Sequence, residues 1–441
     1  MSTTQTKKNT GLIFFPAFDW AISPTHPERE ERLLYTQDQV KEEGLLDLDN
    51  IHEFKAGIAT EKDINRVHIC VPDVKSNVTE SHLISAGGCI KAADVVLSGK
   101  VDNAFALVRP PGHHSMKIVH GNRGFCNVNI EAIMIEHIRT NYPKIKKIAV
   151  VDTDCHHGDG TQDIYFNDPN VLFISLHQDG RTLYPGSGFI NEYGGVNAIG
   201  YNLNIPLPPQ TTDAGFMMAM ENVVMPVLED FKPDLIINSA GQDNHYSDPI
   251  TNMSFSAQGY AKLNHMLNPD IAVLEGGYSI ESALPYVNTG IILAMAGLDY
   301  SNIHEPDYDP SDLRQDEKTG EYIQSVCNEV MELWNSRNEL QKRAHEKFTE
   351  EYFSVNRRVH YDTDGISSQL NERIRVCNNC GGLWLVDTNS SRGYSVYAII
   401  LQRYSCDDCR KAAEKEWKTF NKGSRDFVYF QDVDNDLYQI R

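Results

Sequence analysis

The sequence predicts an α/β fold, in which helices flank a central parallel sheet, with a small cysteine-rich module at the C-terminal end. Short apolar runs alternate with helix-compatible stretches between residues 100 and 300. A polar or Gly-rich turn follows each run, and two Cys-x-x-Cys pairs occur after residue 376. Alternating strands and helices are typical of a parallel sheet that is covered on both faces.

The predicted strands are rich in Val, Ile and Leu, as expected of strands buried on both faces. They are Gly11–Phe15, Ala104–Val108, Ile148–Val151, Val171–Leu176, Leu235–Asn238 and Ile271–Leu274. The spacing of apolar residues between them predicts helices over 130–140, 214–231, 256–267 and 281–297, and a longer one over 321–348.

Length and composition narrow the class of protein. The 441 residues allow one large domain plus an appendage, and we place the large domain at 1–350 and a linker with a small module at 351–441. The stretches 299–320 and 354–372 are polar and are interpreted as loop or linker. The net charge of −21 disfavours nucleic-acid binding, and no apolar run approaches the roughly 20 residues of a membrane span. We therefore expect an intracellular, cytoplasmic protein without a membrane segment.

Polar side chains follow five of the predicted strands. The segments concerned are RPPGHH at 109–114, DTDCHHGDG at 152–160, His177 with the later YPGSG at 184–188, SAGQDNH at 239–245 and EGGY at 275–278. Because parallel strands end at a common edge of the sheet, where ligands bind, the sequence predicts that these segments form one site.

A metal-binding set is predicted within these turns. Alternation along an extended segment places Asp152, Asp154 and His156 on one side of the backbone. Two carboxylates and one imidazole, from Asp154, His156 and Asp243, suit Zn²⁺ or Fe²⁺ and leave a coordination position for water. The alternative is that Asp and His simply occupy surface turns.

Candidate proton-transfer groups lie beside this set. His113 and His114 can pair with the carboxylates of Asp152 and Asp159, which would fix the tautomer of each ring. Such pairs next to a metal-bound water indicate hydrolysis, with Tyr278 as a donor to an oxyanion. Taken alone, the histidine pair would more often be structural and the tyrosine a packing residue.

Seven ordered motifs, RPPGHH, GFCN, DTDCHHGDGTQ, SLH, YPGSG, SAGQD and LEGGY, resemble those of the zinc-dependent histone deacetylase family, which includes bacterial histone deacetylase-like amidohydrolases. The resemblance covers roughly residues 11–300, and THPEREERL at 25–33 resembles the family's N-terminal region. It implies the arginase/deacetylase fold, with a deacetylase catalytic domain over 1–350.

The resemblance assigns roles to individual residues. It implies a catalytic Zn²⁺ held by Asp154, His156 and Asp243, the general base His113 paired with Asp152, the second histidine His114 paired with Asp159, and the carbonyl-polarising Tyr278. It places Gly124, Phe125, Tyr184 and Gly277 at an acyl-lysine tunnel. It further implies K⁺ or Na⁺ at Asp152, Asp154, His156, Ser175 and Leu176, with Tyr165, Val171 and Tyr201 at a second such site.

The implied activity is removal of acetyl groups from lysine side chains in proteins or peptides. The alternative substrate is an acetylated polyamine, which an acidic residue at the tunnel mouth would favour, and the candidates are Asp19, Asp73 and Glu192. A pseudoenzyme that reads acyl-lysine and an arginase-like ureohydrolase are less favoured. The charge of −21 predicts an acidic surface around a tunnel for an otherwise cationic substrate.

Two features depart from the family pattern. Nine residues, SMKIVHGNR, separate His114 from Gly124, and this loop carries His120 and Arg123, either as readers of the substrate or as a neutral variation. The second is Gln242, at a position that is commonly apolar, which makes the polarity of the pocket uncertain.

The two Cys-x-x-Cys pairs predict a structural zinc site. They are Cys377 with Cys380 and Cys406 with Cys409, separated by 25 residues. Four thiolates suit tetrahedral Zn²⁺, and two strand-like halves between the pairs predict a zinc ribbon with one hairpin. A redox role is the weaker alternative, and nucleic-acid binding is disfavoured because arginines and aspartates are mixed here. The sequence assigns the module no role and indicates no oligomeric state.

Overall fold

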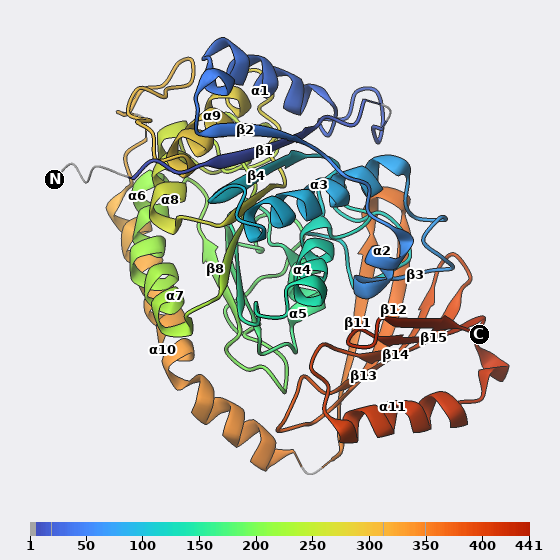
Figure 1. Ribbon diagram of the computed structural model, residues 1–441. Coiled ribbons are helices and arrows are strands. Elements are labelled where there is room, and N and C mark those ends of the chain that lie inside the picture. Colours follow the sequence, from blue (N-terminus) through green and yellow to red (C-terminus); the bar gives the residue numbers. More distant parts are fainter. Residues whose placement is uncertain (1–5, 19, 312, 349) are drawn as a thin grey trace.

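The computed structural model describes residues 6–18, 20–311, 313–348 and 350–441 (Figure 1). Its centre is an eight-stranded sheet in the order β2-β1-β4-β10-β9-β6-β7-β8, in which every pair is parallel. The strands are β1 (Thr10–Phe15), β2 (Ile51–Lys55), β4 (Asn103–Val108), β6 (Ile148–Asp152), β7 (Val171–Gln178), β8 (Asn202–Leu207), β9 (Leu235–Ala240) and β10 (Ile271–Leu274). All six predicted strands are present, while β2 and β8 were missed.

Helices cover both faces of this sheet. One face carries α1 (Glu31–Glu42), α6 (Asp213–Ala219), a π-helical turn (Met220–Val224), α7 (Met225–Phe231), α8 (Ala257–Leu267), α9 (Leu284–Met295) and part of α10 (Glu317–Lys347). The other carries α2 (Glu61–Val67), α3 (Glu80–Leu97), α4 (Ile130–Asn141) and α5 (Asp159–Tyr165).

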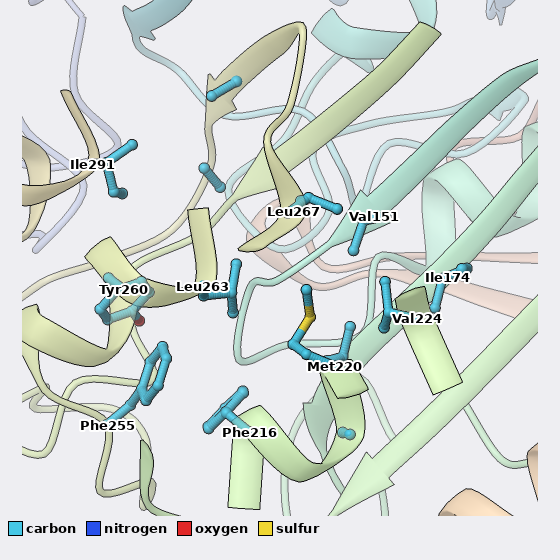
Figure 2. Close-up of a cluster of buried hydrophobic side chains, with 14 of the residues drawn as sticks. Val151, Ile174, Phe216, Met220, Val224, Phe255, Tyr260, Leu263, Leu267 and Ile291 are labelled. Carbon is cyan, nitrogen blue, oxygen red and sulfur yellow. The ribbon is translucent and has the colours of Figure 1, made fainter. Parts of the chain in front are cut away.

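Alternation along the strands supplies both cores. In β6, Ala149 and Val151 point to the first face, whereas Ile148 and Val150 point to the second. Figure 2 shows Val151 near buried side chains of the π-helical turn and α8 on the first face, among them Met220, Val224 and Leu267. Each fully buried large apolar side chain contributes roughly 1.5–3 kcal/mol, so the two cores fix the sheet and hence the positions of its strand ends.

The C-terminal part is a second sheet, in the order β11-β12-β13-β14-β15-β16. Its elements are β11 (Tyr352–Tyr361), β12 (Ile366–Arg375), β13 (Leu383–Ser390), β14 (Ser395–Leu401), α11 (Asp407–Thr419), β15 (Phe427–Asp432) and β16 (Leu437–Ile440). The expectation that 354–372 is a linker is wrong, because these residues form the hairpin of β11 and β12. The hairpin predicted between the cysteine pairs is β13–β14, and it lies inside this larger sheet.

The six-stranded sheet packs on the large domain. Trp384 and Tyr361 on one of its faces belong to the same buried cluster as Met116 and Ile118 of the large domain. Its other face packs on α11 through a separate cluster that includes Cys409. In Figure 1 this sheet lies on the side of the molecule opposite α1 and α9. Within the described residues, no helix combines the length and apolarity needed to cross a membrane.

Candidate active site and metal centres

The predicted catalytic ligands meet at the carboxyl ends of adjacent strands. Asp154 and His156 follow β6, and Asp243 follows β9, which pairs with β6. Nδ1 of His156 lies 2.8 Å from Oδ2 of Asp243 and 3.3 Å from Oδ1 of Asp154. One ligand atom from each residue lies within 4.8 Å of the other two, so the three residues are close enough to share one metal ion.

The chemistry of this site fits a divalent cation. The carboxylates of Asp154 and Asp243 are fully buried, and burial raises the pKa of Asp243 because the ionised form loses its hydration. Buried carboxylates without a cation are costly, and two carboxylates with an imidazole form a donor set suited to Zn²⁺ or Fe²⁺. Gly241 and Gly276 leave room for the carboxylates, since a Cβ on either glycine would overlap Asp154.

The two predicted His–Asp pairs are formed. Nδ1 of His113 lies 3.1 Å from Oδ2 of Asp152, and Nδ1 of His114 lies 2.7 Å from Oδ1 of Asp159. Burial acts to lower the pKa of His113, but the carboxylates of Asp154 and Asp152 outweigh it and hold that pKa well above its usual value. Burial and the neighbouring His113 lower the pKa of His114 to about 4. The two rings therefore differ in basicity although they lie 4.1 Å apart.

Tyr278 is held by a fixed turn. Its backbone N–H donates to Oδ2 of Asp248 at 2.8 Å. The preceding Gly277 has φ +120°, a conformation that disfavours other residues, and its carbonyl accepts from Nε of Arg32 at 2.7 Å. The guanidinium of Arg32 also lies 4.9 Å from the Tyr278 ring. Arg32 of the THPEREERL segment therefore stabilises the turn that carries Tyr278, a contact that the sequence did not predict.

These groups surround a pocket of about 280 Å³. It is lined by Pro111, His113, His114, Gly124, Phe125, Asp154, His156, Leu183, Tyr184, Ile250, Tyr278 and Asp362. Phe125 and Tyr184, the predicted aromatic walls, are among these residues, while Asp243 and Gly277 lie outside the lining. The sequence analysis did not predict Leu183, Ile250 or Asp362 as pocket residues. No sequence motif near Asp362 indicates such a role, because this residue reaches the pocket from the C-terminal sheet.

Some expectations about the pocket mouth are wrong. Asp73 is exposed and binds Ser76 instead, while Glu192 accepts from the backbone N–H groups of Gly188 and Phe189 at 3.1 Å. Neither acid lines the pocket, and Asp19 lies outside the described residues.

The loop of nine residues does not face the substrate pocket. His120 is fully buried, and Nε of Arg123 donates to Oδ2 of Asp159 at 3.0 Å. Gln242 is also buried and donates to the side chain of Asn288, so it contributes no polar group to the pocket lining.

The predicted monovalent-cation sites stay predictions. Asp152 and Ser175 are register partners on β6 and β7, so the first set does converge at one place in the sheet. Oγ of Ser175 lies 2.9 Å from Nδ1 of His177. In the part of the chain that the structure describes, the side-chain clusters able to hold a metal are the Asp–His–Asp set and the four cysteines.

The four cysteines form the second candidate metal centre. The Sγ atoms of Cys377 and Cys406 are 3.7 Å apart, and Sγ of Cys380 lies 3.6 Å from those of Cys377 and Cys409. Four sulfurs bound at ~2.3 Å to a tetrahedral zinc would be separated by about 3.8 Å. A guanidinium nitrogen of Arg375 donates to Sγ of Cys409 at 3.3 Å, as suits a thiolate. The geometry therefore fits a structural zinc.

Comparisons with known proteins agree with this geometry. The model of the histone deacetylase domain matches residues 72–293. A probable deacetylase from Archaeoglobus fulgidus is 44% identical over 326 residues, which are 68% of this chain and 89% of the relative. The Bacillus subtilis acetoin utilization protein AcuC is 31% identical, over 68% of this chain and 86% of its own length.

A histone deacetylase-like amidohydrolase from Pseudomonas aeruginosa is 36% identical, over 53% of this chain and 62% of that protein. The crystal structure of the HDA15 HD domain matches with a TM-score of 0.65 and 26% identity, covering 78% of this chain and 99% of that one. On this evidence of sequence and fold, the chain belongs to the histone deacetylase family.

Proposed function

We propose that the protein is a zinc-dependent amide hydrolase that removes acetyl groups from lysine side chains in proteins or peptides. The observation that carries this proposal is one pocket whose lining combines three kinds of group. They are the metal-binding Asp154 and His156, the histidines of both His–Asp pairs, and Tyr278. These are the groups that metal-assisted hydrolysis needs.

His113 is the proposed base. Bound Zn²⁺ would lower the pKa of its water far below that of bulk water, to about 7, and polarise the acetyl carbonyl. Nε2 of His113 lies 3.8 Å from Oδ1 of Asp154, one of the carboxylates that raise its pKa. Coordination of that carboxylate to the metal would remove part of this charge, which would leave Nε2 of His113 able to accept a proton from water.

Tyr278 is the proposed oxyanion donor. Burial raises the pKa of its phenol well above the usual value, so the hydroxyl keeps its proton, and within the described residues that hydroxyl has no hydrogen-bond partner. It is therefore available to donate to the carbonyl oxygen as negative charge develops there. His114 has a pKa lowered to about 4, so we assign the return of the proton to the leaving amine to His113.

An activity panel on the purified, zinc-loaded protein tests this function. It should compare acetyl-lysine peptides, acetylated polyamines and longer acyl-lysines. We expect Tyr278→Phe and His113→Ala each to lower kcat for the preferred substrate by roughly 10²-fold or more. Tyr286→Phe, on α9 and outside the pocket lining, is the matched control.

Full activity in either pocket variant would contradict the assigned roles. Preference for an acetylated polyamine over every peptide would instead replace the proposed substrate with the small acetylated amine, and would leave the hydrolytic mechanism intact.

A further inference from the structure

One acidic side chain reaches the substrate pocket from outside the catalytic domain. Asp362 lies at the turn between β11 and β12, where residues Asp362–Asp364 form a 3₁₀ turn. It is half-buried and is the residue that the C-terminal sheet adds to the pocket lining. The second sheet is therefore part of the wall of this pocket.

Among the described residues, hydrogen-bond donors reach only one oxygen of this carboxylate. Oδ1 of Asp362 accepts from the hydroxyl of Tyr184 at 2.9 Å and from the backbone N–H of Gly124 at 3.2 Å. These contacts tie Asp362 to two predicted walls of the tunnel. No described residue donates to Oδ2, which leaves that oxygen available to a ligand.

Within the part of the chain that the structure describes, no cationic side chain pairs directly with this carboxylate. Among the described residues, no Lys, Arg or His forms an ion pair with Asp362. The guanidinium of Arg123 interacts electrostatically with Asp362 at longer range. It forms its ion pair with Asp159 instead and lies over the Tyr184 ring. Phe125, Leu183 and Ile250, which also line the pocket, carry no charge. Among the described residues, the Asp362 carboxylate therefore has no direct ion-pair partner beside the tunnel walls.

The nine-residue loop holds this turn in place. The backbone N–H of Asn122 donates to Oδ2 of Asp364 at 2.7 Å, and Arg123 donates to the carbonyl of His360 at 2.5 Å. The hydroxyl of Tyr361 donates to the carbonyl of Ile118 at 2.7 Å. The loop that departs from the family pattern thus docks the turn, so Asp362 has a fixed position at the pocket.

We propose that Asp362 is a specificity-determining residue, which favours acetylated substrates that carry an ammonium or guanidinium group next to the acetylated amine. This inference rests on the proposed deacetylase function and deepens it. The shared chemistry is a positive charge, supplied either by a second amine of a small acetylated diamine or by a basic side chain of a peptide.

The test measures kcat/KM for two matched substrate pairs with the zinc-loaded full chain. The first pair is mono-acetylated 1,4-diaminobutane and N-pentylacetamide, which differ by an ammonium in place of a methyl group. The second pair is acetyl-lysine peptides with lysine or norleucine as the neighbouring residue. For each pair, the cationic-to-neutral ratio is the kcat/KM of the cationic substrate divided by that of the neutral one. The pair with the larger ratio identifies the source of the positive charge.

We expect Asp362→Asn to lower the cationic-to-neutral ratio about tenfold in at least one pair, and Asp362→Glu to retain most of it. The amide of asparagine still accepts a hydrogen bond, so support of Tyr184 and Gly124 is retained. Salt should lower the wild-type ratio but leave that of Asp362→Asn nearly constant, because only the former depends on charge. Asp38→Asn, at an exposed position on α1 outside the pocket lining, is the matched control and should keep the wild-type ratio.

An equal loss on cationic and neutral substrates in Asp362→Asn would show a purely structural role and overturn this inference. An unchanged ratio in both pairs would overturn it as well. Hydrolysis of the neutral substrates by the wild-type protein supports the proposed function in either case, whereas failure to hydrolyse any member of the panel contradicts the proposed function itself.

Discussion

His68 shows how a single buried ring responds to its partners. Its Nδ1 donates to the carbonyl of Met116 and its Nε2 accepts from the backbone N–H of Asn129, both at 2.8 Å. This pattern requires the neutral ring, because a protonated Nε2 would face another donor. Burial lowers the pKa of His68 to about 3, while the Met116 carbonyl opposes and Lys117 reinforces that effect.

This pKa predicts a loss of stability in acid. The folded pKa lies below the unfolded value of about 6.5, so the stabilisation is complete above pH 6.5 and is lost as the pH falls from there toward 3. Between pH 7 and pH 5 the loss from His68 should be about 2 kcal/mol in the free energy of unfolding. Urea unfolding of His68→Gln should therefore show a pH dependence flatter by that amount than the wild type.

An equally steep loss of stability in His68→Gln would show that other groups, such as the buried His82, account for the acid sensitivity.

At the scale of elements, a buried charge cluster fastens the start of α1 to the sheet. Oε1 of Glu28 accepts from Nε of Arg109 at 2.7 Å, and its Oε2 pairs with Arg32. All three side chains are fully buried. Arg32 also donates to the carbonyls of Glu275 and Gly277, so the cluster connects the N-terminal segment to the turn that carries Tyr278.

Glu28→Gln should destabilise the protein strongly. It leaves two buried guanidinium groups without their shared carboxylate, and breaking a buried pair in this way costs about 3–5 kcal/mol. Glu31→Gln, in an ion pair that is about one-third exposed, should cost less than about 1 kcal/mol. Urea denaturation at pH 7 measures both variants, and equal stabilities would show that water or nearby carbonyls replace the carboxylate.

The elements also show what the sequence can reveal. Strands buried on both faces, such as β6 and β7, have continuous apolar runs and were predicted within two residues. The segment β8 contains two asparagines and a proline, and in β2 at the sheet edge only Ile51 is buried, so neither has such a run. In β12 every second residue is exposed, and this polarity suggested a linker although it is typical of a one-sided antiparallel strand.

The same reasoning explains the site. Asp154, His156 and Asp243 were predicted together because parallel strands end at one edge, which is a rule of topology. Asp362 enters from an antiparallel hairpin more than a hundred residues further along the chain. Nothing in the local pattern of residues relates that turn to the sheet edge, so only the packing of the two sheets places it there.

For the whole molecule, the two sheets behave as one unit because they share a buried interface. Tyr361 and Trp384 belong to the cluster that includes Met116 of the large domain. Arg403 of the C-terminal part pairs with Glu136 of α4 at 2.8 Å, and both side chains are buried. A displacement of the C-terminal sheet should therefore also displace the turn that carries Asp362, and with it one wall of the pocket.

The four-cysteine centre gives the last prediction. The cysteines join the loop after β12 to the start of α11, and Arg375 at the end of β12 donates to Cys409. The purified protein should contain about two zinc ions per chain, and Cys409→Ser about one, because a tetrahedral site that loses one thiolate binds zinc weakly. Cys327→Ser, a buried cysteine on α10 that belongs to neither metal-binding cluster, should keep two.

Hydrogen exchange should locate the effect of Cys409→Ser. Protection should fall in residues 377–382 and in α11, while β6 and β9 of the parallel sheet keep theirs because their cores are separate from that of α11. Exchange should also rise at the β11–β12 turn, since β12 leads directly to the first cysteine pair. Equal zinc contents in Cys409→Ser and the wild type, or unchanged exchange in α11 after the substitution, would show that the cysteine centre holds no structural metal. One zinc per wild-type chain would remove either this metal or the catalytic one.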